Sequence, residues 1–369
     1  MPVTDGMDIA GSRDAIEQFS CKNPAFLCVI SHTDVSEVPG ITVAGANPGM
    51  VKYTSPADAE FLHYGHCKCI PLVPATPDGK PTPALITRAA LQGAKIPLVV
   101  VEAGTKIKPA IPAISFGMPY GANIATLDAM PVQDVEKALA YGRALGRQIA
   151  RASDLVVVGE SIPGGTTTAL AVLGALGVDA RFKVSSSMPE NPHQLKNRLV
   201  ASAYERVKFV QGDTMMSAVD AIAHFGDPMM PSVAGIAAGV IEEGGSRVML
   251  AGGTQMAAVL AVLAALDVPL EQKKICIGTT IYVTNDKSSD LSGLVRSISQ
   301  DVPVLACDLH LGESAKPGLR AFAEGFVKEG VGAGGLSIAA MLKTKMDGKE
   351  MKRLIEKEYE LSIERRPTT

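Results

Sequence analysis

Short runs of Val, Ile and Leu recur along the chain, and most are followed by a turn and by a longer stretch with a helical spacing of apolar residues. The short runs predict strands at Phe26–Ser31, Leu98–Val101, Leu155–Val158, Arg247–Leu250, Lys274–Val283 and Val302–Cys307. The longer stretches predict helices at Val132–Ala150, Thr167–Leu176, Pro192–Tyr204, Ser232–Glu242, Gln255–Leu266 and Leu336–Lys345. Because the strands do not alternate strictly between apolar and polar residues, we expect burial on both faces, as in a parallel sheet.

The alternation of strands with helices predicts an α/β fold with a doubly wound, mostly parallel, Rossmann-like sheet that binds its ligand at the carboxyl ends of the strands. We expect a core over residues 98–342, an N-terminal part over residues 1–97, and a C-terminal helix and tail over residues 343–369. The chain ends are expected to form a smaller helical subdomain. Pro71–Pro83 and Lys106–Pro119 predict long loops, which either shape a site or are plain surface excursions.

Composition narrows the class of protein. Of the 369 residues, 47% are hydrophobic and 20% are charged, which is typical of a globular chain. The net charge of −3 and the lack of a basic block favour neither nucleic acid nor an anionic membrane as a partner. The most apolar run, Met256–Leu266, has eleven residues, whereas a membrane-spanning helix needs about 20. No secretion signal is visible and the six cysteines are scattered, so we expect a cytoplasmic protein with reduced thiols.

The segment from Asp154 to Thr168 carries a candidate phosphate site. An apolar strand leads into a glycine-rich turn that opens an Ala/Leu-rich helix. The lysine of a P-loop nucleoside triphosphatase is missing, which argues against that class of enzyme. Free amides and the helix dipole at such a turn favour a phosphate, and the Thr166 and Thr167 hydroxyls add donors. The residues that allow close approach of a ligand are Gly159, Gly164 and Gly165. The alternative is a simple strand–turn–helix junction capped by Thr166.

Two glutamates give these turns a chemical role. Glu160 lies beside the expected phosphate. A carboxylate in that position is electrostatically costly unless the carboxylate contacts a ribose hydroxyl or a developing cation. Glu329 directly precedes Gly330, Gly332 and an apolar helix, so a partly desolvated carboxylate there could act as a general base. The alternative for Glu329 is that it only favours the N-terminus of the helix.

No metal site is expected from the sequence. Four potential ligands lie close together, but their spacing fits no standard zinc pattern and no second Cys/His pair follows: His63, His66, Cys67 and Cys69. Asp308 and His310 follow a predicted strand and either help to line the site or form a solvated turn.

From about Leu98 to Leu342, these segments resemble, in order, the nicotinate-nucleotide–dimethylbenzimidazole phosphoribosyltransferases, and in particular the divergent archaeal and cyanobacterial branch of that CobT-like family. The family's Gly-Glu-Met-Gly-Ile-Gly-Asn-Thr-Thr motif is matched at Gly159, Glu160, Thr166 and Thr167, whereas Ser161–Gly165 departs from it. Glu329–Ala333 is similar to the family's Glu-Gly-Thr-Gly-Ala, whose glutamate is the proposed base. Five further stretches are similar to family segments: Val99–Gly104, Gly121–Pro131, Ser232–Gly239, Ala251–Ala258 and His310–Gly318.

The resemblance implies transfer of the phosphoribosyl group of nicotinate mononucleotide to a benzimidazole-type base, without a cofactor, in a homodimer. It implies that Glu329 is the base, that Glu160 acts near the reacting carbon, and that Lys196 lies near the nucleotide. The other binding residues it implies are Asn123, Gly159, Ser161, Gly164, Gly165, Thr166, Thr167, Gly330 and Gly332. The acceptor side would draw on residues 1–97. A nucleotide-binding protein without transferase activity and a transferase acting on another base remain the alternatives.

Overall fold

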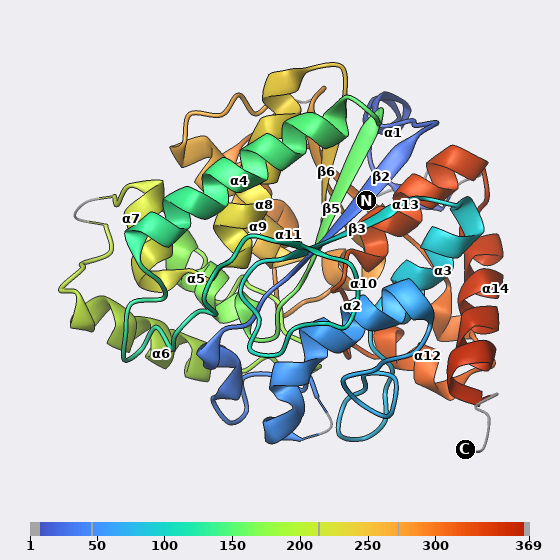
Figure 1. The fold of residues 1–369 in the computed structure, drawn as a ribbon, viewed down its shortest axis with the longest axis horizontal. Helices are drawn as coiled ribbons and strands as arrows, with labels where there is room; N and C mark the ends of the chain where they lie inside the picture. The colour runs from blue at the N-terminus through green and yellow to red at the C-terminus, as the bar shows by residue number, and fades with distance from the viewer. Residues whose placement is uncertain (1–7, 46, 213–214, 272, 365–369) are drawn as a thin grey trace.

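The computed structural model describes residues 8–45, 47–212, 215–271 and 273–364 (Figure 1). Within them, one sheet of eight strands has the order β1-β8-β7-β6-β5-β2-β3-β4, in which only β1 is antiparallel to its neighbour. The strands are β1 Ile9–Ala10, β2 Pro24–Ile30, β3 Leu98–Glu102, β4 Ile114–Ser115, β5 Leu155–Ser161, β6 Arg247–Ala251, β7 Ile275–Thr280 and β8 Val304–Cys307. The expected doubly wound, mostly parallel sheet is therefore confirmed.

Helices cover both faces of this sheet (Figure 1). The face that carries α4 and α8 also packs α5, α6, α7, α9 and α11: α4 Val132–Ala150, α5 Gly165–Ala175, α6 His193–Arg206, α7 Ala218–Phe225, α8 Met229–Glu243, α9 Thr254–Ala265 and α11 Leu291–Ile298. The other face packs helices mainly from the two chain ends: α1 Arg13–Gln18, α2 Thr54–Tyr64, α3 Ala84–Ala94, α12 Pro317–Ala323, α13 Ala333–Thr344 and α14 Gly348–Tyr359. The helices from the chain ends therefore flank one face of the same sheet.

The central strand β2 shows why both faces are apolar. Its residues are all buried, and successive side chains point to opposite faces of the sheet. Leu27 and Val29 join the core under α4 and α8, whereas Phe26, Cys28 and Ile30 join the core under α3 and α13. A strand buried on both sides has no polar positions to alternate with, which explains the continuous apolar runs in the sequence.

The predicted elements agree closely with the structure. All six predicted strands and six predicted helices are present, and the predicted bounds of α4 are those observed. The strand predicted to reach Val283 ends at Thr280, because residues 281–284 form the short helix α10 (Ile281–Thr284). Four further one-turn helices lie in loops or at the chain end: Asp34–Glu37 (η1), Pro48–Tyr53 (η2), Leu311–Glu313 (η3) and Glu360–Glu364 (η4). Among the described helices, none is long and apolar enough to cross a membrane.

Candidate functional site

A pocket opens at the carboxyl ends of β5 and β6, where the N-termini of α5, α9 and α13 converge. The space between its walls, including the open mouth, is about 970 Å³. Each helix brings residues of its first turn, or those just before it, to the wall: Gly164, Gly165 and Thr166 for α5, Gly253, Thr254 and Gln255 for α9, and Glu329, Gly330 and Val331 for α13. Three helix N-termini give this pocket a positive potential from backbone amides alone.

The glycine-rich turn is shorter than its sequence suggests. Strand β5 continues through Ser161, which pairs with Ile30 of β2, so Glu160 lies in a strand and only residues 162–164 form the turn. Helix α5 begins at Gly165 with Gly164 as its N-cap, in the left-handed region at φ 79°. Capping by Thr166 is therefore wrong. Gly164 is needed here because a Cβ would lie 2.9 Å from the Cα of Ser36.

The first amides of α5 are open to a ligand. No side-chain hydrogen bond caps this helix, and the Thr166 N–H has no partner within the described residues. Thr166 lines the pocket, while Thr167 lies fully buried behind it with its hydroxyl oxygen unpaired. This is the arrangement that binds phosphate at a helix N-terminus.

Glu160 is 3% exposed and projects to the pocket from the end of β5. One carboxyl oxygen accepts from the backbone N–H of Ile162 at 3.0 Å, and the other accepts from the Gln255 amide at 3.0 Å. Burial raises the pKa of Glu160 well above its ordinary value, and the neighbouring carboxylates of Asp227, Glu329 and Asp58 raise it further. Glu160 therefore sits at the floor of the site, ready to hold a hydroxyl group or to face a positive charge.

Glu329 lies on the pocket wall at the N-terminus of α13. Its carboxylate accepts from the backbone N–H groups of Gly330, Thr280 and Gly334, at 3.2, 3.1 and 3.1 Å, and from the Thr279 hydroxyl at 3.3 Å. Burial raises the pKa of Glu329 to about 7, against these hydrogen bonds, which lower it. Glu329 thus both caps the helix and presents a carboxylate that changes its charge near neutral pH.

Two of the predicted glycines allow β5 to pack closely against the N-terminus of α13. A Cβ on Gly159 would come within 2.7 Å of the Cα of Gly332, and a Cβ on Gly332 within 2.8 Å of the Phe26 ring. Gly332 also adopts φ 72° as the N-cap of α13. Neither glycine lines the pocket, so their contribution is to bring the α13 N-terminus, and Glu329 with it, against β5.

The other predicted residues divide between the wall and the region behind it. Ser161, Gly164, Gly165 and Gly330 line the pocket. Lys196 does not: it is fully buried, and its ammonium donates to the Ser185 carbonyl oxygen and to Asn191 Oδ1. Asn123 lies outside the pocket lining and accepts from the Ala125 amide in a turn.

Burial lowers the pKa of Lys196 to about 7, and nearby Lys328 lowers it further. Lys196 holds Ser185 in place, and Ser185 begins the stretch of three serines, Ser185–Ser187, that lines the pocket. Its observed position is that of a residue that supports the wall.

Several lining residues were not singled out from the sequence. Asp58 of α2 is 2% exposed and accepts from Thr82 and Ser161 hydroxyls, both at 2.7 Å, and burial raises its pKa to about 6. Lys80, the cation of the wall, pairs with Asp78 and lies 3.8 Å from the centroid of the Phe326 ring. The signal for Asp58 was an acid, one of two with Glu60, in a helix of mostly small and apolar residues. The signal for Lys80 was its place in the predicted loop Pro71–Pro83.

Comparison with known proteins agrees with this geometry. A family model described as phosphoribosyltransferase matches residues 85–315. The UPF0284 protein of Archaeoglobus fulgidus is 47% identical over 352 residues, covering 95% of this chain and 97% of the relative. That of Methanothermobacter thermautotrophicus is 40% identical over 345 residues, covering 93% and 94%.

Two solved structures from Thermus thermophilus share the fold, each at 18% identity over 93% of this chain. One is a nicotinate-nucleotide-dimethylbenzimidazole phosphoribosyltransferase, with a TM-score of 0.59 over 88% of its chain. The other is CobT, with a TM-score of 0.62 over 89% of its chain. The chain belongs to the phosphoribosyltransferase family, together with the UPF0284 proteins.

Proposed function

We propose that this protein transfers the 5-phosphoribosyl group of nicotinate mononucleotide to a benzimidazole-type base, releasing nicotinate and an α-ribotide. The observation that carries the proposal is the Glu329 carboxylate, with a pKa near 7, on the wall of a pocket that also contains the open N-terminus of α5. A general base works best when its pKa lies near the operating pH. Such a transfer needs one pocket that contains both a phosphate site and a general base whose pKa lies near the operating pH.

The donor phosphate is placed at the first turn of α5. Thr166 lines the pocket there, with Ser186 and Ser187 also on the wall. Contacts to the phosphate are remote from the C1′ carbon that reacts, so their binding energy fixes the orientation of the reacting carbon. Lys196 supports this part of the wall through Ser185.

The reaction exchanges one carbon–nitrogen bond for another. The bond from C1′ to the nicotinate nitrogen breaks, and its electron pair neutralises the pyridinium ring. A lone pair on one nitrogen of the base forms the new bond to C1′ from the opposite face, which inverts the carbon. The proton on the other nitrogen of the base passes to Glu329. Glu160, at the pocket floor, would hold a ribose hydroxyl or stabilise the cation-like carbon.

The proposal is tested with purified protein, nicotinate mononucleotide and a panel of bases that includes dimethylbenzimidazole, adenine and a phenol. We expect free nicotinate and a new α-ribotide in equal amounts by chromatography and mass spectrometry. Donor binding is measured separately by thermal unfolding, since a ligand at a hundredfold excess over its Kd stabilises the native state by about 2.7 kcal/mol.

The outcomes separate the alternatives. A donor-dependent rise in Tm without turnover on any base would indicate a nucleotide-binding protein without transferase activity. Turnover with adenine or a phenol, but not with a benzimidazole, would assign a different acceptor. No rise in Tm at millimolar nicotinate mononucleotide would refute the donor.

A further inference from the structure

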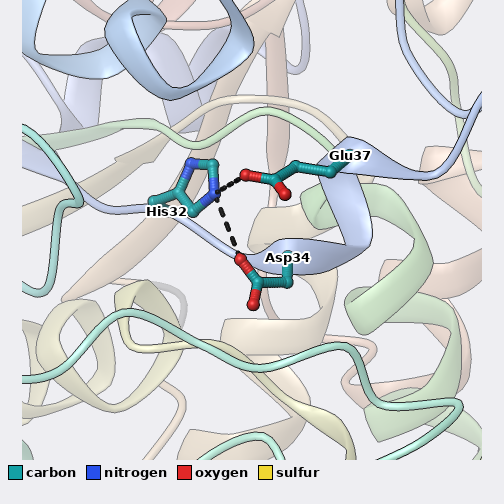
Figure 2. Close-up of side chains that lie close together, drawn as sticks. All are labelled: His32, Asp34 and Glu37. Atoms are coloured by element: carbon teal, nitrogen blue, oxygen red, sulfur yellow. Dashed lines mark ion pairs between the residues drawn. The ribbon is translucent and has the colours of Figure 1, made fainter. Parts of the chain in front are cut away.

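A second cluster of chemically active side chains lies just after β2, outside the pocket lining (Figure 2). His32 follows the end of the strand, and Asp34 and Glu37 are the first and last residues of the one-turn helix η1. Figure 2 shows the imidazole and both carboxyl groups directed toward one another. This site could not be predicted from the sequence, because His-x-Asp-x-x-Glu matches no common metal pattern.

The distances within the cluster fit one metal ion. His32 Nε2 lies 3.6 Å from Asp34 Oδ1 and 3.4 Å from Glu37 Oε1, and the three ligand atoms all lie within 4.8 Å of one another. Zinc bonds of about 2.1 Å at tetrahedral angles place two ligand atoms about 3.4 Å apart. An octahedral ion with the same bond length would bring neighbouring ligands to about 3.0 Å.

His32 supplies an independent sign of a missing ligand. Its side chain is 2% exposed, and Nε2 has no hydrogen-bond partner in the described structure. The backbone on both sides is fixed: the His32 N–H donates to Gly104 at 2.8 Å, and its carbonyl accepts from Gly121 at 2.9 Å. In its neutral form, the imidazole can offer the lone pair on Nε2 to a metal. A buried ring nitrogen that is fixed in place and makes no hydrogen bond is costly unless something binds it.

We propose that this cluster is a zinc site in which His32 Nε2, Asp34 Oδ1 and Glu37 Oε1 bind the ion and water takes the fourth position. One imidazole and two carboxylates form a neutral site with Zn²⁺ and match its preference for nitrogen and oxygen ligands in a tetrahedron. The site is distinct from the pocket of the proposed transferase, and zinc binding does not depend on that function.

Lys106 is the group with which zinc must compete. Its ammonium contacts Asp34 Oδ1 and lies 2.7 Å from Glu37 Oε1, and it also lies 4.7 Å from the centroid of the Tyr120 ring. The Lys106 side chain is 20% exposed, so it can turn toward solvent when the ion binds. Lys106 therefore offsets one of the two negative charges in the metal-free protein, and zinc replaces it.

Binding of the ion would act on the phosphate turn through η1. Ser36, between the two carboxylate ligands, packs against Gly164, the N-cap of α5. An ion that fixes Asp34 and Glu37 would hold Ser36 against that turn. A stabilising structural metal is the expected role, with tighter donor binding as its consequence if the proposed transferase function holds.

The test measures zinc binding to the metal-free full-length protein by calorimetry, without any substrate. We expect one zinc ion per chain and a rise in Tm on binding. H32N and E37Q should each weaken binding by about 100-fold or more, since each removes a ligand. K106M should tighten it by about tenfold, because a competing charge is removed. Cobalt in place of zinc should give the intense visible absorption of a tetrahedral site in the wild type and lose it in E37Q.

H310N is the matched control. His310 also faces carboxylates, with Nε2 3.3 Å from Asp8 Oδ2 and Nδ1 3.7 Å from Asp308 Oδ2, but this group does not converge within the distance of one ion. The H310N variant should therefore bind zinc with the affinity of the wild type. Glu37 is 44% exposed at its side chain, so E37Q is expected to fold, which circular dichroism will verify. Unchanged zinc affinity in folded E37Q, or weaker binding in K106M, would overturn the proposal.

Discussion

Replacement of Glu329 by Gln tests the base most directly. The carboxylate faces four donors, three backbone N–H groups and the Thr279 hydroxyl, with both oxygens accepting. A glutamine must turn its NH₂ toward at least one backbone N–H, so we expect a loss of stability of about 1–3 kcal/mol. If Glu329 takes the proton of the acceptor, kcat should fall by about 10²–10⁴ while donor binding stays near normal.

The pH profile gives a second, independent measure of the same role. With a pKa of about 7, Glu329 is protonated on the acidic side, so the wild-type kcat/KM should fall about tenfold per pH unit below that value. E329Q should lack this limb. The assay follows nicotinate release from pH 5 to 9 with donor saturating and acceptor varied, and an acceptor that attacks already deprotonated should lose less in E329Q.

The control for structural damage is E60Q. Glu60 is fully buried outside the pocket and accepts from three backbone N–H groups, those of Lys68, Cys69 and Ala110. The E60Q variant should lose about as much stability as E329Q and keep the wild-type kcat. Wild-type turnover in E329Q, or an equal loss of kcat in the two variants at matched stability, would refute the base assignment.

Three more predictions concern the walls of the site. K196M should raise the donor KM by about tenfold and lower stability, because the Ser185 carbonyl loses its buried partner; unchanged donor kinetics in a folded variant would separate Lys196 from the site. G159A should cost about 1–3 kcal/mol in chemical denaturation, since its Cβ would lie 2.7 Å from the Gly332 Cα, and an equally stable variant would contradict the close packing. Burial raises the pKa of Asp58 from 3.8 to about 6, so its proton is held more tightly in the folded state, and the free energy of unfolding should fall by about 3 kcal/mol as the pH rises from 4 to above 6. D58N should lack that decrease, and a decrease in D58N equal to that of the wild type would exclude Asp58 as its source.

The sequence was a good guide to long elements and to motifs that are local. Helix α4 has a clear polar and apolar face along 19 residues, so its bounds follow from periodicity. Strands β1 and β4 have only two residues each, and β1 exists because Ile9 pairs with Cys307, almost 300 residues away. No local pattern can signal such a pairing.

The site shows the same division. Glu160 and Glu329 could be found because each lies beside a glycine-rich turn. Asp58 could not, because its partners Thr82 and Ser161 come from two distant segments. The family resemblance placed Lys196 near the nucleotide, but sequence cannot show that a side chain ends behind a wall instead of in front of it.

The three helix ends at the pocket explain how one site could treat its two substrates differently. The backbone amides at the start of α13 already donate to the Glu329 carboxylate, so they are not free to bind a phosphate. The Thr166 amide at the start of α5 is unclaimed, so that end attracts the phosphate. Glu160 also lines the pocket, and its raised pKa favours the neutral carboxyl, which can share a hydrogen bond with a ribose hydroxyl. In the proposed reaction, the donor would therefore lie with its phosphate at α5, its ribose over Glu160 and its C1′ carbon facing the base that Glu329 would deprotonate.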